Sequence, residues 1–145
     1  MYFVLDTNIL VHLIRENEQI IQLVEDLEKA GAEVFISIVS VGEIYSLAYQ
    51  FAWGKHKLQE MERLLEQLIP IPIDNKELAK MYAEIDTYSQ HKNPVIAMPK
   101  GISARNMGKN DIWIAATAYL LEATLITMDN DFNHLDSVYF NVLKA

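Results

Sequence analysis

The chain has 145 residues, with 12 basic and 20 acidic side chains and a formal net charge of −8. This length suits one hydrophobic core, so we expect residues 1–145 to form a single domain. The apolar share of 51% and the charged share of 22% exclude a disordered or fibrous protein. The absence of cysteine excludes disulfide scaffolds, iron–sulfur clusters and cysteine nucleophiles, so a bound metal would need oxygen or histidine ligands.

The apolar runs are too short for a membrane span, which needs roughly 20 residues. The first five residues carry no basic side chain before their apolar stretch, so they do not resemble a secretory signal. We therefore expect a cytoplasmic protein with no membrane segment.

Strands and helices are expected to alternate in the first half of the chain. Strands are indicated by short β-branched and aromatic runs, and helices by apolar residues at helical spacing. The expected order is a strand at Tyr2–Leu5, a helix over Ile9–Ile14, a helix containing Ile20–Leu27 that ends at Gly31, a strand at Glu33–Ile38, and helices over Ser40–Gln50 and Leu58–Leu68.

The second half continues this alternation. Two prolines make Ile69–Ile73 an edge strand or an extended lead-in. The expected order then is a helix capped by Asp74 and running to about Ser89, a loop over His91–Gly108, a helix over Asp111–Leu121, a strand at Ala123–Thr127, a helical turn at Asp131–Leu135 and a strand at Ser137–Leu143. The sequence thus predicts a three-layer α/β/α fold with a mainly parallel sheet of four to five strands.

Four acidic residues lie close to the predicted carboxyl ends of strands. Asp6 directly follows the first strand, Glu43 lies in the helix after the second, Asp111 opens the helix that leads into the strand at Ala123–Thr127, and Asp129 follows that strand. Sites in open α/β sheets form at this rim, and right-handed crossovers return each helix start to it. We therefore expect the four carboxylates to converge.

Four neighbouring carboxylates repel one another unless a positive charge lies between them. Oxygen-only ligands favour Mg²⁺ or Mn²⁺, which share their coordination with substrate phosphates. Such ions promote phosphodiester hydrolysis by activating a water, so no nucleophilic side chain is required.

Each acidic residue also has a purely structural alternative. The alternatives are a helix cap at Asp6, a capping box of Ser40 with Glu43, a favourable interaction of Asp111 with a helix dipole, and a turn built from Asp129, Asn130 and Asp131. Their common position at one rim is what favours a site.

The motifs of this chain resemble those of the PIN-domain ribonucleases. Within that family, they are most similar to the motifs of the VapC-type toxins of prokaryotic toxin–antitoxin pairs. The matching segments are Val4–Asn8, Glu43 after Ser40, Asn110–Ala118 and Thr127–Phe132, and they follow the family's order along the whole chain.

This resemblance implies an Mg²⁺- or Mn²⁺-dependent endoribonuclease. Its metal ligands and catalytic acids would be Asp6, Glu43, Asp111 and Asp129, with Asp131 as an alternative to Asp129, while Thr7, Asn8 and Thr127 would orient carboxylates or water. It also implies a homodimer and a cognate antitoxin protein whose tail occupies a groove of the toxin.

An RNA must approach this acidic chain through basic residues. The segment Thr87–Asn110 contains Lys100, Arg105 and Lys109, has no acidic residue and ends beside Asp111. We expect these three side chains to contact phosphates, although a solvated loop that balances the acidic helices is the simpler alternative.

Two other functions remain open. A non-catalytic PIN-like module would only bind partners, although all four acidic residues are present. A phosphatase of the haloacid dehalogenase type also begins with an aspartate after the first strand, but that family needs a second aspartate where this chain has Asn8.

Overall fold

A five-stranded parallel sheet organises the chain, which the computed structural model describes over residues 1–145. The strands are β1 (Tyr2–Leu5), β2 (Glu33–Ser37), β3 (Ile69–Ile71), β4 (Thr124–Thr127) and β5 (Val142–Lys144). Their spatial order is β3-β2-β1-β4-β5, and all four pairings are parallel. The α/β fold predicted from the sequence is confirmed.

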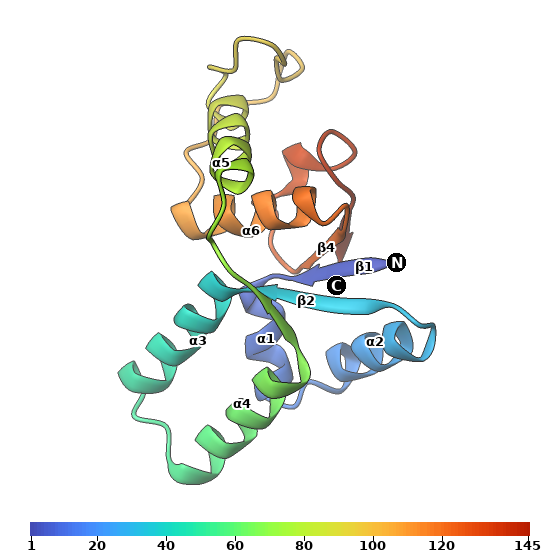
Figure 1. Cartoon of the computed structure of the whole chain (residues 1–145), viewed down its shortest axis with the longest axis vertical. Coiled ribbons are helices and arrows are strands. Elements are labelled where there is room, and N and C mark those ends of the chain that lie inside the picture. Colours follow the sequence, from blue (N-terminus) through green and yellow to red (C-terminus); the bar gives the residue numbers. More distant parts are fainter.

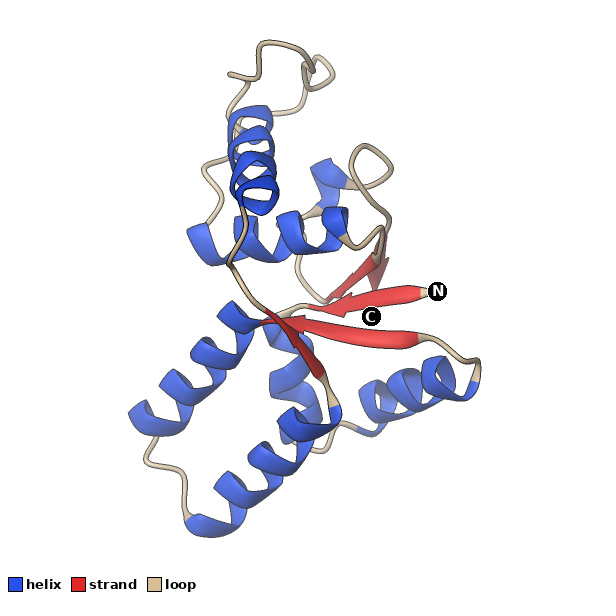
Figure 2. Cartoon of the chain, in the orientation of Figure 1, coloured by secondary structure: helices blue, strands red, loops and turns tan.

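Helices cover both faces of this sheet, which gives the three layers seen in Figure 2. They are α1 (Thr7–Ile14), α2 (Glu18–Lys29), α3 (Ile38–Gln50), α4 (Lys55–Gln67), α5 (Lys76–Ser89), α6 (Lys109–Leu120) and the short 3₁₀ helix η1 (Asn133–Leu135). In Figure 1, α1 to α4 lie on one side of the sheet and α5 and α6 on the other. None of these helices combines the length and the apolar character of a membrane span.

The central strand β1 separates two hydrophobic clusters. Val4 packs into the cluster formed with α5 and α6, whereas Phe3 and Leu5 pack into the cluster formed with α1 to α4. This follows from the alternation of side chains along a strand whose two faces are both covered. The buried alanines Ala115 and Ala116 bring α6 close to the sheet.

Several element boundaries differ from those expected. Helix α3 begins at Ile38 because Ser37 caps it, with Ser37 Oγ accepting from Val39 N at 3.1 Å. Helix α5 is capped by Asn75 rather than by Asp74, since Asn75 Oδ1 accepts from Leu78 N at 2.8 Å.

The last strand is also shorter than expected. Residues before Val142 form a turn, in which Ser137 has a φ of 60° and Ser137 N donates to Phe140 O at 2.8 Å. The strand therefore pairs with β4 only over Val142–Lys144. By contrast, Gly31 has a φ of 82° just after α2, as its predicted role at the helix end requires.

Candidate active site

Asp6 lies at the carboxyl end of the central strand β1 and is only 3% exposed. Its Oδ1 accepts from Thr7 N at 2.7 Å, which caps α1, and its Oδ2 accepts from Thr127 Oγ1 at 2.7 Å. The capping alternative is thus present together with a second contact to β4. Both carboxylate oxygens are fixed at the junction of two strands.

Glu43 faces the same junction from α3. Its Oε1 accepts from Thr7 Oγ1 at 2.9 Å, and the buried Ser40 Oγ lies 2.9 Å from the same threonine hydroxyl. The capping-box alternative for Glu43 is wrong, because Ser37 is the cap and Ser40 lies inside the helix. Thr7 therefore links Glu43 to Asp6, because its hydroxyl donates to Glu43 and its backbone N donates to Asp6.

Asp111 lies in the first turn of α6, whose cap is Gly108 without a side-chain hydrogen bond. It opens onto a pocket of about 490 Å³, and the lining residues are Arg105, Asn106, Met107, Gly108, Asp111, Asn130 and Asp131. The pocket brings the start of α6 next to the loop that follows β4.

Asp129 and Asp131 are both exposed on the loop between β4 and η1. The backbone N of Asp129 donates to Thr127 Oγ1 at 3.0 Å, so the hydroxyl that holds Asp6 also shapes this loop. Asp131, in turn, shares the pocket with Asp111. The two candidates for the fourth acid thus lie beside different members of the set.

The electrostatics of these residues show that the carboxylates are close. Burial, followed by the charges of Asp129 and Glu43, raises the pKa of Asp6 to about 6 despite the lowering effect of its hydrogen bonds. Burial, followed by the charges of Asp6, Asp131, Glu43 and Asp129, raises the pKa of Asp111 to about 7. No three carboxylate or imidazole groups already form a metal-binding cluster in this structure.

Asn8 also faces this rim. Its Oδ1 accepts from Met128 N at 3.4 Å, while its buried Nδ2 has no hydrogen-bond partner. An unsatisfied buried amide is costly, so Nδ2 is a donor that lacks a protein acceptor at this rim.

The three predicted basic residues occupy different places. Arg105 is half-buried in the pocket with Asp111, and Lys109 is the exposed first residue of α6. Lys100 is exposed in the long loop between α5 and α6, which extends beyond the end of α5 in Figure 1.

Sequence reasoning missed one basic residue, Lys144 on β5. Its Nζ donates to Asp129 O and, at 2.6 Å, to Asn130 Oδ1. No local motif marks it, because its partners lie in the adjacent strand's loop. Only the pairing of β4 with β5 could have indicated it.

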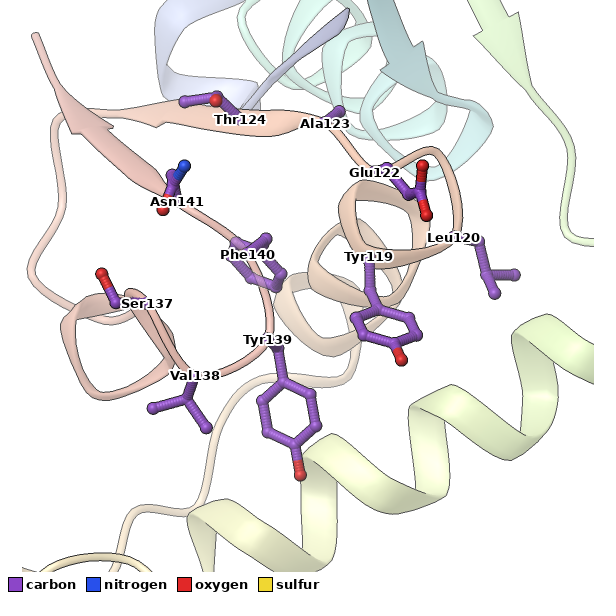
Figure 3. A pocket seen from close by; sticks show the side chains of 10 residues that line it. All are labelled: Tyr119, Leu120, Glu122, Ala123, Thr124, Ser137, Val138, Tyr139, Phe140 and Asn141. Atoms are coloured by element: carbon purple, nitrogen blue, oxygen red, sulfur yellow. The ribbon is translucent and has the colours of Figure 1, made fainter.

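The largest pocket, of about 630 Å³, lies elsewhere. Figure 3 shows its lining residues at the end of α6, the start of β4 and the turn before β5. This is the amino-end rim, opposite the carboxylates. Tyr119 and Tyr139 meet there edge to face, with ring centroids 5.9 Å apart.

Comparison with known proteins agrees with this fold. The PIN domain model matches residues 3–138. The VapBC2 structure from Rickettsia felis, bound to a DNA fragment from its promoter, gives a TM-score of 0.76 with 24% identity, covering 99% of this chain and 98% of that chain. FitAB bound to an IR36 DNA fragment gives 0.73 with 25% identity, covering 98% and 94%.

DNA-bound VapBC from Salmonella typhimurium gives a TM-score of 0.72 with 19% identity, covering 99% of this chain and 98% of that chain. No curated protein sequence matches the chain. The family match spans nearly all of the sequence, from β1 to the turn before β5. The chain therefore belongs to the PIN-domain family.

Proposed function

We propose that the chain is an Mg²⁺- or Mn²⁺-dependent endoribonuclease whose metal ligands and catalytic acids are Asp6, Glu43, Asp111 and Asp129, with Asp131 as the alternative to Asp129. The observation that carries this proposal is the geometry of the rim: Thr127 Oγ1 contacts both the buried Asp6 and the backbone of Asp129, Thr7 contacts Glu43, and Asp111 shares a pocket with Asp131. Burial and neighbouring carboxylates also raise the pKa of Asp6 and that of Asp111. Without a cation, these groups are held where their ionised form is unfavourable. Hard divalent cations prefer such an oxygen-only donor set.

The side chains around the acids would hold them ready for the reaction. Thr127 orients Asp6, Thr7 orients Glu43, and Asn8 supports the loop after β4 by accepting from Met128 N. A divalent cation bound by the acids would lower the pKa of the attacking water and offset the charge that develops on the phosphate. The chain then needs no nucleophile of its own.

The RNA backbone would follow the basic residues of the α5–α6 loop. Arg105 lines the pocket that contains Asp111, and Lys109 lies two positions before Asp111 in α6. Lys100 would contact the RNA farther from the acids, because it lies on the extended part of the loop.

We further propose that the chain, as one cytoplasmic PIN domain over residues 1–145, is the toxin of a toxin–antitoxin pair and forms a homodimer. The VapBC and FitAB complexes among its structural neighbours support this assignment. A groove of about 350 Å³ between α1, α2 and α4 has the apolar floor and acidic rim that an amphipathic, basic antitoxin tail would fit. Glu25, Glu28 and Glu60 are among the acids of that rim.

The non-catalytic alternative gives no role to the four acids at the carboxyl ends of the strands. The phosphatase alternative lacks its second aspartate, because position 8 is an asparagine, whose Oδ1 accepts from Met128 N. The nuclease and the two alternatives predict different results in one set of assays.

The test is incubation of the purified protein with internally labelled RNA in Mg²⁺, in Mn²⁺ and in excess EDTA. We expect internal cleavage only with a divalent cation, and restored cleavage when Mg²⁺ is added back to the chelated sample. Turnover of a phosphomonoester without RNA cleavage would favour the phosphatase. Inactivity on both substrates in every metal would favour the binding module.

A further inference from the structure

Asn130 receives two cations from distant parts of the chain. Arg105 Nη1 donates to Asn130 O at 2.9 Å, and Lys144 Nζ donates to Asn130 Oδ1 at 2.6 Å. Asn130 itself lies between the acidic residues Asp129 and Asp131. Two positive charges therefore border the loop that contributes the last acids of the proposed site.

Each cation is fixed by backbone contacts of its own segment. Arg105 N donates to Ser89 O at 2.7 Å, which ties this part of the α5–α6 loop to the end of α5. Lys144 lies opposite Thr127 in the pairing of β4 with β5. The positions of both side chains thus follow from the fold rather than from chance contacts of a free loop.

Neither cation is neutralised by an ion pair. The ion pairs of the structure join Lys29 to Glu25, Arg63 to Glu60 and Lys80 to Glu77, all on helix surfaces. Arg105 and Lys144 instead use a carbonyl or an amide oxygen, and the acceptors are neutral. Neither charge is therefore paired directly with a carboxylate.

Both side chains also keep free donors. An arginine has five N–H groups, of which Arg105 uses one here, and a lysine has three, of which Lys144 uses two. Lys144 is exposed, and Arg105 opens onto the pocket that contains Asp111 and Asp131. A phosphate beside the acids could reach both.

We propose that Lys144 and Arg105 form a two-cation clamp that binds the phosphates of the RNA next to the scissile bond. This inference rests on the proposed ribonuclease function and adds Lys144 to the predicted RNA contacts. The clamp adds to the positive charge of Lys109, which lies at the start of α6 near the same acids.

The test measures RNA binding rather than cleavage. Every protein carries Asp6→Asn to prevent cleavage, and the affinity for a short fluorescein-labelled single-stranded RNA is measured in Mg²⁺ over a range of KCl concentrations. The compared variants are Lys144→Gln, Arg105→Gln, their combination, Lys144→Arg, and Lys29→Gln as a control with the same loss of charge on α2.

Each phosphate contact with single-stranded RNA contributes about 0.7 to the slope of log affinity against log salt. We expect Lys144→Gln and Arg105→Gln each to flatten the slope by about 0.7 and the double variant by about 1.4. Lys144→Arg should keep the parent slope because it keeps the charge, and Lys29→Gln should keep it because Lys29 lies away from the site.

If the double variant and Lys29→Gln had the same slope of log affinity against log salt, the clamp would be overturned. This holds even if the double variant bound RNA more weakly because its loop had moved. Failure of the parent protein to bind the RNA would overturn it as well. Normal binding with the expected slopes, but no cleavage by the chain with native Asp6, would contradict the proposed nuclease and leave the clamp standing.

Discussion

At the scale of single residues, the buried carboxyl of Asp6 makes the stability of the chain depend on pH. Its pKa in the folded chain is raised to about 6 from 3.8, so the folded state binds the proton more tightly than the unfolded state. The unfolding free energy contributed by this group therefore falls as pH rises from about 4 to about 6. Asn at this position could still cap α1 and would carry no charge.

We predict that Asp6→Asn gains stability over the native chain as pH rises. In EDTA, the difference in unfolding free energy should be near zero at about pH 4 and reach on the order of 2 to 3 kcal/mol at neutral pH. Urea unfolding of both proteins across this range measures it. A difference that does not change with pH would contradict the raised pKa of Asp6.

A second prediction at this scale separates Asp129 from Asp131. Asp129 is joined to Asp6 through the hydroxyl of Thr127, whereas Asp131 lies beside Asp111. We expect Asp129→Ala to lower the rate of RNA cleavage far more than Asp131→Ala, because Asp129 follows β4 more directly. Cleavage rates of the two variants, measured in parallel, test this prediction. A slower rate for Asp131→Ala than for Asp129→Ala would assign the role of the fourth catalytic acid to Asp131.

At the scale of elements, a buried contact joins α5 to η1. His134 Nε2 lies 2.7 Å from Ser89 Oγ, and Ser89 Oγ donates to Ile85 O at 2.8 Å, so Nε2 must be the donor. Burial and the charge of Arg105 lower the pKa of His134 to about 4, so the imidazole is neutral at neutral pH. This contact anchors η1, and with it the end of the acidic loop, against α5.

We predict that Ser89→Ala destabilises the protein by about 1 to 3 kcal/mol, because it leaves the buried His134 N–H without an acceptor. Thr87→Ala is the matched control, since Thr87 Oγ1 also donates to a backbone carbonyl of α5, at 2.8 Å, but Thr87 is only partly buried. That control should change the unfolding free energy by no more than about 0.5 kcal/mol. Equal losses of unfolding free energy in the two variants would show that the contact with His134 adds no more stability than the hydrogen bond of Thr87.

The order and type of the elements could be predicted because hydrophobic period and turn residues are local signals. The start of α3 could not, because the β-branched pair Ile38 and Val39 continues the strand pattern, and both Ser37 and Ser40 suit a cap. Likewise, residues from Ser137 onward have strand-like composition, but the φ of 60° at Ser137 bends the chain before it can pair.

At the scale of the whole molecule, the acidic rim could be predicted because parallel strands end at one side of the sheet. Its internal contacts could not. Thr7 with Ser40, and Lys144 with Asp129, depend on side chains that only the folded sheet brings together. The sequence alone also gave no reason to separate Lys100 from Arg105, which lie in different parts of one loop.

The charge distribution of the whole chain leads to a further prediction. Replacing Lys100, Arg105 and Lys109 together by Ala should weaken RNA binding with little change in the fold, and flatten the salt slope by roughly two to three units. The affinity of an RNA oligonucleotide at several salt concentrations measures this, with circular dichroism as the control for folding. An unchanged slope would place the RNA path elsewhere on the surface.

The central claim is that the chain cleaves RNA with the help of a divalent cation, which Asp6 and the neighbouring carboxylates would bind. The most direct measurement is the rate of RNA cleavage in Mg²⁺ by the native chain and by Asp6→Asn, with thermal unfolding of both proteins to verify the fold. We predict that the native chain cleaves and that the folded variant has lost this activity. Undiminished cleavage by Asp6→Asn, or by the native chain in excess chelator, would contradict the claim.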